Sequence, residues 1–182
     1  RLDRALEANK ARIRRAVTAT DTTLCDIYGV GTVVAAFLIG YTPPIDRFKT
    51  PDKYAAYNGT APIEVSSGGK TRHRLSRRGN RILNHAIHTA AVTQISHHTP
   101  GRDYYDRKLD EGKTDKEALR ALKRRISNAV YRQLKADARR HNICFITASG
   151  TRFPQLVSAR ILHGHEDQLE TEVVKSSCEM PL

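Results

Sequence analysis

Tryptophan is absent from this chain of 182 residues, and aromatic side chains make up only 6% of it. With so few aromatic side chains we expect a small and mostly aliphatic core, and one compact domain with short appendages. The three cysteines, at positions 25, 144 and 178, lack the spacing of a zinc site or of a disulfide framework. We therefore expect a reducing environment, and no metal or other cofactor held by this chain.

Long apolar runs are missing as well. The longest, from Val33 to Ile39, is far shorter than the roughly 20 residues that cross a bilayer. No signal-peptide pattern occurs either. These absences predict a cytoplasmic location and no membrane partner. Because the first residue is Arg1 and the only methionine is Met180, we also expect a fragment of a longer protein or a damaged reading frame.

Acidic residues are few compared with basic ones: 19 Asp and Glu stand against 31 Lys and Arg, which gives a net charge of +12. The excess lies in residues 1–140, with 28 basic and 14 acidic residues, whereas residues 141–182 have 3 and 5. A strongly basic protein usually has an anionic partner, and nucleic acid is the commonest one. We therefore expect residues 1–140 to bind nucleic acid.

Apolar residues recur at helical spacing through most of the chain, which predicts a mainly α-helical fold. We expect a helical arm over 1–24, a domain over 25–140 and a weakly structured tail over 141–182. The arm has a single apolar stripe, which fits either a short coiled coil between copies of the chain or a helix packed on the domain. The stripe consists of Leu2, Leu6, Ile13, Val17 and Leu24.

Two glycines stand one residue apart, at Gly29 and Gly31, directly before Thr32 and an apolar helix predicted over 33–39. The pattern resembles a helix-hairpin-helix unit, in which the turn and the next helix start offer backbone amides to a phosphate. Such contacts bind the nucleic-acid backbone and do not read sequence. An ordinary helical hairpin in the core has the same pattern. We expect Gly40 to end the helix.

Residue types typical of helix ends divide the rest of the domain. Helix starts are predicted at Thr50-Pro51, at Ser76 and at Thr114 with Glu117, and a helix end at Asn58-Gly59. Between them we expect short strands over 63–65 and 71–75 around a Gly68-Gly69 turn, and a loop over 97–103. A long helix is expected after Thr114, and the domain is expected to end near residue 140.

A run of basic residues follows the predicted turn without any acidic residue among them. It consists of Lys70, Arg72, Arg74, Arg77, Arg78 and Arg81. No Asp or Glu occurs between Glu64 and Asp103. Like charges this close together repel, so the run is costly unless an anion joins it. Either it binds phosphates or it is a soluble basic surface.

The two serines Ser66 and Ser67 stand directly before Gly68-Gly69 and this basic run. Glycine after serine leaves the hydroxyl open to a bulky phosphate, and nearby arginines would stabilise the charge that develops on phosphorus during attack. A serine in a glycine-rich turn is more often only a turn residue. From the residues alone, both interpretations stay open.

Three stretches together resemble the C-terminal domain of the Piv/MooV-type transposases, those of the insertion-sequence 110/116/902 group. They are Tyr57-Asn58-Gly59-Thr60-Ala61-Pro62, Ser66-Ser67-Gly68-Gly69-Lys70 and Leu75-Ser76-Arg77-Arg78-Gly79-Asn80-Arg81-Ile82-Leu83. The Gly29-Val30-Gly31 turn is similar to the opening motif of that domain. The resemblance covers about residues 20 to 140 and leaves out the tail.

The resemblance implies a DNA recombinase in which Ser67, or the adjacent Ser66, attacks the scissile phosphate and becomes linked to DNA. The implied backbone contacts are Gly29, Gly31, Thr32, Gly68, Gly69, Lys70, Arg72, Arg74, Arg77, Arg78 and Arg81. In this family an N-terminal RuvC-like domain holds Mg²⁺ on acidic residues, and no segment of this chain replaces that domain. We therefore expect the isolated chain to bind nucleic acid without recombining it.

The expected partners are DNA, a guide RNA as in some members of the family, and further copies of the chain joined through the helical arm. A non-catalytic helix-hairpin-helix module that only holds the duplex backbone is the alternative function. Asp103, Asp106 and Asp110 are interpreted as a solvated helix start and not as a metal site. His85 and His88 are interpreted as surface residues, and the Tyr104-Tyr105 pair as packing residues, although each is also a candidate contact to nucleic acid.

Overall fold

The computed structural model describes residues 2–67, 70–75 and 79–149 of the chain, with side chains over 2–62 and 79–141. Predictions for Gly68, Gly69, Ser76, Arg77 and Arg78, and for the tail from residue 150 onward, lie outside these residues. The described part is mainly helical, as the sequence predicts. Its elements are α1 (Leu2–Ala19), η1 (Leu24–Asp26), α2 (Thr32–Tyr41), η2 (Ile45–Arg47), α3 (Pro51–Tyr57), β1 (Pro62–Ser67), β2 (Lys70–Leu75), α4 (Arg81–Ile95), α5 (Pro100–Asp110) and α6 (Asp115–Ser149).

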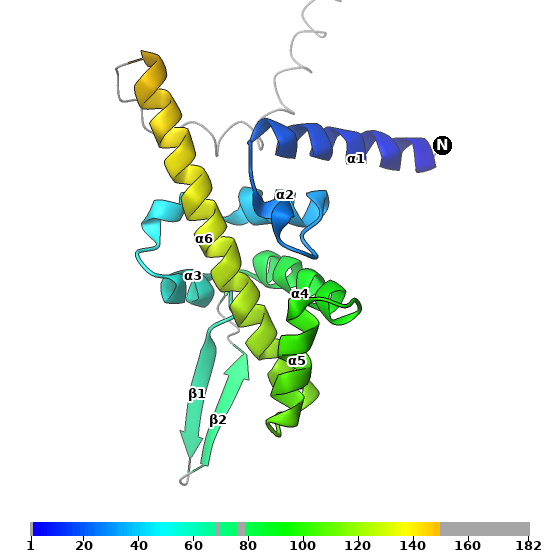
Figure 1. The fold of residues 1–182 in the computed structure, drawn as a ribbon, viewed down its shortest axis with the longest axis vertical. Helices are drawn as coiled ribbons and strands as arrows, with labels where there is room; N and C mark the ends of the chain where they lie inside the picture. The colour runs from blue at the N-terminus through cyan, green and yellow to red at the C-terminus, as the bar shows by residue number, and fades with distance from the viewer. Residues whose placement is uncertain (1, 68–69, 76–78, 150–182) are drawn as a thin grey trace, which may run out of the picture.

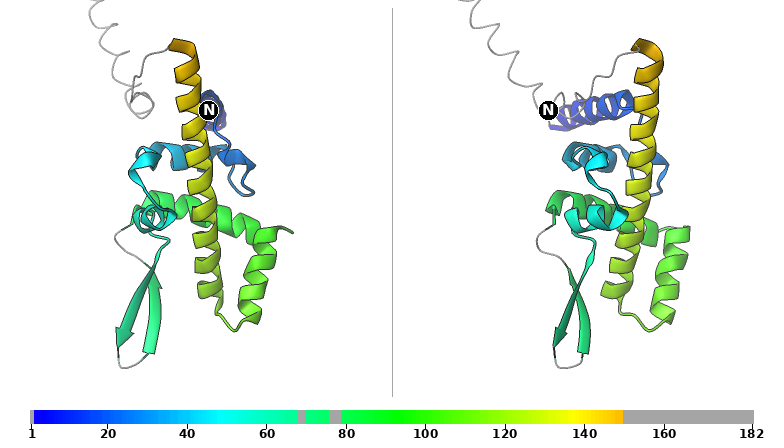
Figure 2. Two further views of the ribbon diagram at one scale, coloured as in Figure 1. Left: turned by 60° about the vertical axis from the view of Figure 1, so that its left-hand side comes forward. Right: turned by 90° about the vertical axis from the view of Figure 1, so that its left-hand side faces the viewer.

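The long helix α6 is the spine of the molecule (Figure 1). Helices α3 and α4 and the 3-10 helices η1 and η2 pack against it, α5 runs beside its first half, and α1 and α2 pack on each other. The two strands form an antiparallel hairpin that extends away from the helical body in all three views (Figures 1 and 2). The free end of α1 also points away from that body.

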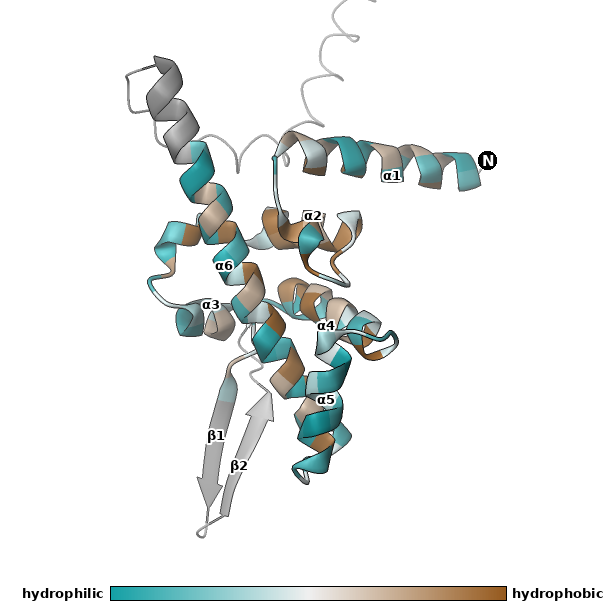
Figure 3. Ribbon diagram, viewed as in Figure 1, coloured by the Kyte–Doolittle hydropathy of each residue, from teal (hydrophilic) through white to brown (hydrophobic). Residues whose placement is uncertain are grey.

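The core forms where α4 packs against both α2 and α6. Its fully buried members include Leu38, Leu83, Ile87, Leu122 and Val130. Helices α2 and α4 contribute much of the apolar surface, whereas α5 is largely hydrophilic (Figure 3). Among the described residues, no helix has both the length and the apolar composition that a membrane span requires.

The predicted arm is shorter than expected. Helix α1 ends at Ala19, five residues before the predicted end, because Asp21 adopts a left-handed conformation with φ 47° and the chain then forms the short helix η1. Only the C-terminal half of α1 packs: Val17 is buried, while Leu2 and Leu6 are 83% and 52% exposed. The apolar stripe therefore covers α2 at one end and is open to solvent at the other.

The Gly29-Gly31 turn has a single 3-10 turn, η1, before it and α2 after it. This arrangement does not confirm a helix-hairpin-helix unit. The sequence predicted that Gly40 ends α2. In the structure Gly40 lies inside this helix, which continues to Tyr41. A Cβ on Gly40 would meet no atom within 4 Å, so this glycine is compatible with a regular helix.

Side-chain caps are found at the starts of α3, α4 and α5. Thr50 caps α3 as predicted, its Oγ1 accepting a hydrogen bond from the Lys53 amide at 3.3 Å. Helix α4, in contrast, is capped by Asn80 and not by Ser76 as expected, since Asn80 Oδ1 accepts from the amides of Ile82 and Leu83 at 3.0 and 3.1 Å.

The predicted loop over 97–103 is shorter in the structure. Thr99 caps a further helix, α5, its Oγ1 accepting from the Arg102 amide at 3.1 Å. A threonine followed by Pro100 is the same helix-start signal as Thr50-Pro51. The sequence analysis applied that signal at the first position and missed it at the second.

Helix α6 begins as predicted and continues past the expected end of the domain. Glu117 closes half of the expected capping box, its carboxylate accepting from the Thr114 amide at 3.1 Å. Leu122, Ile126 and Val130 face the core as expected. The helix runs without a break past residue 140, where the domain was expected to end, and ends at Ser149.

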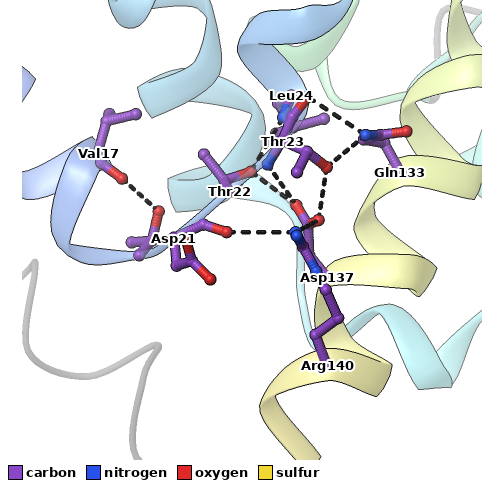
Figure 4. Close-up of polar contacts among 9 residues, drawn as sticks. Val17, Asp21, Thr22, Thr23, Leu24, Gln133, Asp137 and Arg140 are labelled. Atoms are coloured by element: carbon purple, nitrogen blue, oxygen red, sulfur yellow. Dashed lines mark hydrogen bonds and ion pairs between the residues drawn. The ribbon is translucent and has the colours of Figure 1, made fainter.

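A buried carboxylate ties the chain after α1 to α6 (Figure 4). Asp137, 5% exposed, accepts hydrogen bonds from the Thr22 hydroxyl at 2.8 Å and from the Thr23 amide and hydroxyl at 3.1 and 2.7 Å. Arg140 pairs with the same carboxylate. Burial alone would raise the pKa of Asp137, but the hydrogen bonds from Thr23, Thr22 and Arg140 outweigh it and lower the pKa.

Candidate nucleic-acid interface

The hairpin carries both predicted serine nucleophiles and part of the basic run. Strand β1 ends at Ser67 and β2 begins at Lys70, and these two residues are register partners. Arg72 pairs with Val65 and Arg74 with Ile63, so basic residues occupy every second position of β2 from its start. Because paired Cα atoms in an antiparallel ladder lie about 4.5–5.5 Å apart, the backbone of Lys70 runs close beside that of Ser67.

Two glycines hold the ends of the hairpin together. Gly59, with φ 73°, precedes β1, and Gly79 follows β2. Their backbones touch so closely that a Cβ on Gly79 would lie 2.3 Å from the Gly59 Cα. Beside this contact the Asn80 amide donates to the Tyr57 carbonyl at 2.7 Å. The hairpin therefore leaves the helical body and returns to it at one point, between the end of α3 and the start of α4.

A buried asparagine fixes this point to the spine. Asn58 is fully buried, and its amide nitrogen donates to Ser127 Oγ in α6 at 2.8 Å. Its side-chain oxygen accepts from the amide and the hydroxyl of Thr60 at 3.1 and 2.7 Å, where the chain turns into β1. A buried amide with its donor and acceptor both in use holds one geometry, because losing any partner leaves a polar atom unsatisfied.

The network extends into α4 and back to α6. Asn84 donates to the Asn58 carbonyl at 3.1 Å and accepts from Lys123 Nζ at 2.6 Å. Lys123 is only 7% exposed, and burial lowers the pKa of its ammonium group. His88, one turn further along α4, is half-buried, and its pKa is lowered by burial, by Lys123 and by His85. These polar residues link the base of the hairpin to two helices.

The other predicted phosphate contacts lie in the turn from Gly29 to Gly31, away from the hairpin. Gly29, with φ 82°, is the third residue of a turn closed by the Val30 amide and the Ile27 carbonyl. A Cβ on Gly29 would lie 2.6 Å from the Ala90 carbonyl oxygen in α4. Both its conformation and this contact require glycine, which makes Gly29 a packing residue.

The second glycine of that turn differs from the first. Gly31 has extended backbone angles, is the N-cap of α2 directly before Thr32, and has open space around the position of a Cβ. The turn packs on α4 near Ala90, whereas the hairpin joins α4 at Arg81. Nine helical residues separate these points, which corresponds to about 14 Å. The two predicted groups of phosphate contacts therefore reach α4 at two separate points.

The remaining candidates lie on the surface near the hairpin or in helix packing. Arg81 and His85 are exposed on α4. Asp106 pairs with Arg102 at 2.8 Å, as expected of a solvated helix start. Among the described residues, no group of three or more His, Cys, Asp or Glu could hold a metal ion. Tyr104 is partly buried against the core beside three basic residues, Arg107, Lys108 and Arg125.

Comparison with known proteins gives this arrangement a family context. The model of the transposase IS116/IS110/IS902 family matches residues 21–106. The chain is therefore similar to a transposase family over the part that carries the hairpin. An uncharacterized 44.8 kDa protein of insertion element IS116 from Streptomyces clavuligerus is 28% identical over 137 residues, which are 74% of this chain and 34% of the relative.

A second relative supports the same similarity. An uncharacterized 42 kDa protein of insertion element IS900 from Mycobacterium paratuberculosis is 33% identical over 115 residues, which are 62% of this chain and 29% of that protein. The chain thus spans about a third of the length of the curated relatives it matches. Both relatives are encoded by insertion elements, as the resemblance in the sequence implied.

Sequence reasoning missed the residues that anchor the hairpin. Asn58 was interpreted only as a helix end, and Asn84, Lys123 and Ser127 were not singled out. Asn58 belongs to the stretch that carries the family resemblance, which was one signal for it. Lys123 stands in a Lys-Arg-Arg sequence of α6 that has the appearance of a solvated face. Only the rotation of α6 against α4 distinguishes the buried lysine from its more exposed neighbours, Arg124 and Arg125.

Proposed function

We propose that this chain is the part of an insertion-element transposase that binds DNA through the β1–β2 hairpin and supplies a serine nucleophile. The observation that carries the proposal is the anchored hairpin. Ser67 is the register partner of Lys70, and both stand on an element that projects from the body and is fixed at its base by Asn58 and the two glycines. The match to the transposase family model over residues 21–106 supports the same conclusion.

The proposed reaction is a transesterification at phosphorus. The Ser67 oxygen loses its proton to solvent and forms a bond to the scissile phosphorus, while the bond from phosphorus to one deoxyribose oxygen breaks. That oxygen leaves with the electron pair and takes up a proton, so a serine–phosphate diester replaces a DNA phosphodiester. Basic residues close to this phosphate stabilise the negative charge that builds up on its oxygens during attack. Ser66 is the alternative nucleophile.

Magnesium belongs to the proposal only as a contribution from outside this chain. Among the described residues no acidic cluster fits a metal ion, so no step is assigned to a metal here. The RuvC-like domain implied by the family resemblance would hold it. We accordingly expect the chain alone to bind DNA without joining to it. A guide RNA, and assembly of copies through the exposed end of α1, are further proposals that the family resemblance suggests.

A purely structural binding module is the second candidate. The observation that favours it is Gly31, which begins α2 with open space where a side chain would stand. A helix start without a nearby side chain lets a phosphate approach its amides. Such a module would hold the duplex backbone and would need no hydroxyl on the hairpin.

The Ser67→Ala variant separates the two candidates. The chain is combined with the RuvC-like domain of a relative and with DNA, and covalent protein–DNA adducts are detected on denaturing gels. We expect the adduct to disappear in Ser67→Ala while DNA affinity stays within about twofold, because a single neutral hydroxyl contributes little to backbone binding. Ser66→Ala is the matched control and should retain the adduct.

Two outcomes would contradict the assignment. An adduct that survives Ser67→Ala and disappears in Ser66→Ala would move the nucleophile by one residue. Complete absence of an adduct in the wild-type combination, with DNA still bound, would favour the binding module over the recombinase.

A further inference from the structure

A groove of about 360 Å³ lies beside the base of the hairpin. Its walls come from three parts of the chain: the residues that lead from α3 into β1, the Tyr104 side of α5, and the first turns of α6. Ala61, Pro62 and Ala121 provide apolar surface, and four basic side chains line the rest together with Glu117. The basic residues are Lys113, Arg120, Lys123 and Arg124.

Three of these four cations already have a carboxylate partner. Arg124 pairs with Asp52, Arg120 approaches Glu117 to 3.8 Å, and Lys113 approaches Glu111 to 3.8 Å. Their charges are therefore largely compensated within the protein. They shape the groove and do not by themselves demand a ligand.

Lys123 is different. Among the described side chains its Nζ has one hydrogen-bond partner, the neutral amide oxygen of Asn84 at 2.6 Å, and no carboxylate within ion-pair distance. An ammonium group carries three N–H donors, and burying it without a counter-charge is costly. Burial lowers the pKa of Lys123, as expected for a cation held without an anion. The half-buried His88 adds no negative charge on the α4 side.

A phosphate group would supply what this position lacks. It brings a negative charge and several acceptor oxygens to the two remaining N–H donors, and charge-assisted hydrogen bonds of this kind are the strong ones. The apolar residues Ala61, Pro62 and Ala121 suit the sugar that adjoins a phosphate. A small pocket of mixed apolar and cationic character is thus matched to a nucleotide unit.

We propose that this groove binds one phosphate group of a nucleic-acid strand, with Lys123 as its main contact. The identity of the strand rests on the proposed function, whereas the preference of the groove for an anion does not. Pro62 lines the groove and lies five residues before Ser67 on β1, a distance of about 17 Å along an extended strand. At one charge per 3.4 Å of strand, the groove phosphate lies about five nucleotides from the phosphate at the serine.

The experiment compares Lys123→Met with Lys116→Met. Lys116 is an exposed lysine on the same helix outside the groove, so both variants lose one charge by the same side-chain change. The probe is a fluorescein-labelled 20-nucleotide thymidine strand, and anisotropy gives its affinity at several salt concentrations. For Lys123→Met we expect an affinity loss of about tenfold, and a log–log salt slope less steep by about 0.7. Lys116→Met should match the wild type within twofold.

A second measurement needs no variant that could misfold. The ammonium signal of Lys123 is followed by NMR in the wild-type chain, after assignment with Lys123→Arg, while inorganic phosphate is added. We expect a saturable shift and a rise in the pKa of Lys123, because a bound anion favours the charged form.

The outcomes separate the two proposals. If the thymidine strand binds but Lys123→Met equals the wild type and phosphate leaves the Lys123 signal unmoved, the groove assignment is overturned and the DNA-binding function stands. If phosphate moves that signal but no strand binds at low salt, the groove is an anion site and the nucleic-acid function is overturned. Both proposals are supported if Lys123→Met, but not Lys116→Met, weakens strand binding and if phosphate shifts the NMR signal of Lys123.

Discussion

Gly59 and Gly79 meet backbone to backbone at the base of the hairpin, where a Cβ on Gly79 would lie 2.3 Å from the Gly59 Cα and 2.4 Å from its amide nitrogen. No side-chain rotation can relieve such a contact, because both partners are main chain. The two residues are 20 positions apart and stand on either side of the hairpin. Their contact therefore decides where the element that carries Ser67 leaves the helical body.

Gly79→Ala should separate these backbones and destabilise the fold. We expect a loss of about 2–3 kcal/mol in the free energy of unfolding, which is the usual cost of forcing extra atoms into a packed site. Urea unfolding followed by circular dichroism measures it. Gly40→Ala is the control with the opposite sign: its Cβ meets no atom inside α2, and alanine should stabilise that helix by about 0.5–1 kcal/mol. Equal changes in the free energy of unfolding for Gly79→Ala and Gly40→Ala would contradict the close contact between Gly59 and Gly79.

Asp137 makes stability depend on pH. Its pKa in the folded chain is lowered from the ordinary 3.8. A carboxyl with a depressed pKa contributes stability above its unfolded pKa, and that contribution is lost as the pH falls through the folded pKa. Asp137→Asn should therefore cost about 2–4 kcal/mol at pH 7, where the hydrogen bonds from Thr22, Thr23 and Arg140 lose a charged acceptor.

Urea unfolding of both proteins from pH 7 down to pH 3 tests this prediction. The difference between wild type and Asp137→Asn should shrink below about pH 4, as the wild-type carboxyl takes up its proton. Asp46→Asn is the matched control, since Asp46 pairs with Lys135 at 2.8 Å but its side chain is 68% exposed. It should cost less than about 1 kcal/mol. A pH-independent difference for Asp137→Asn would indicate a steric effect.

Local signals were the part of the fold that the sequence could predict. The cap at Thr50, the helix end at Asn58-Gly59 and the inward face of α6 depend on neighbours within one or two turns, and the structure has all three. The errors arise where a distant contact decides. After α1 ends at Ala19, Thr22 and Thr23 bind Asp137, more than 110 residues away, and nothing in residues 1–24 indicates this contact.

The same distinction between local signals and distant contacts applies to the candidate site. The serines and the basic run are visible in the sequence because they are contiguous. The residues that anchor the hairpin are not, because Asn58, Asn84, Lys123 and Ser127 are polar residues on three segments, brought together only by the packing of α3 and α4 on α6. Helical periodicity places apolar residues in a core but gives no sign of which polar residue is buried among them.

The basic run from Lys70 to Arg81 should carry the salt dependence of DNA binding. Replacing Arg74, Arg77 and Arg78 together with alanine removes three nearby cations from a segment without acidic residues. Affinity should fall alike for DNA of any sequence, since phosphate contacts do not read bases. The log–log salt slope should become less steep by about 2 to 3, or nearly one unit for each lost phosphate contact.

The control for this triple variant has the same net charge but an unchanged hairpin. Lys10, Lys108 and Lys135 each pair with a carboxylate, at 2.8, 2.6 and 2.8 Å, and are replaced together by alanine. Anisotropy titrations with a random-sequence duplex at several salt concentrations compare the two variants. The charges of these three lysines are already neutralised within the protein, so the control variant should bind DNA nearly as the wild type does. Equal losses of DNA affinity in both variants would mean that total charge, and not the basic run, attracts DNA.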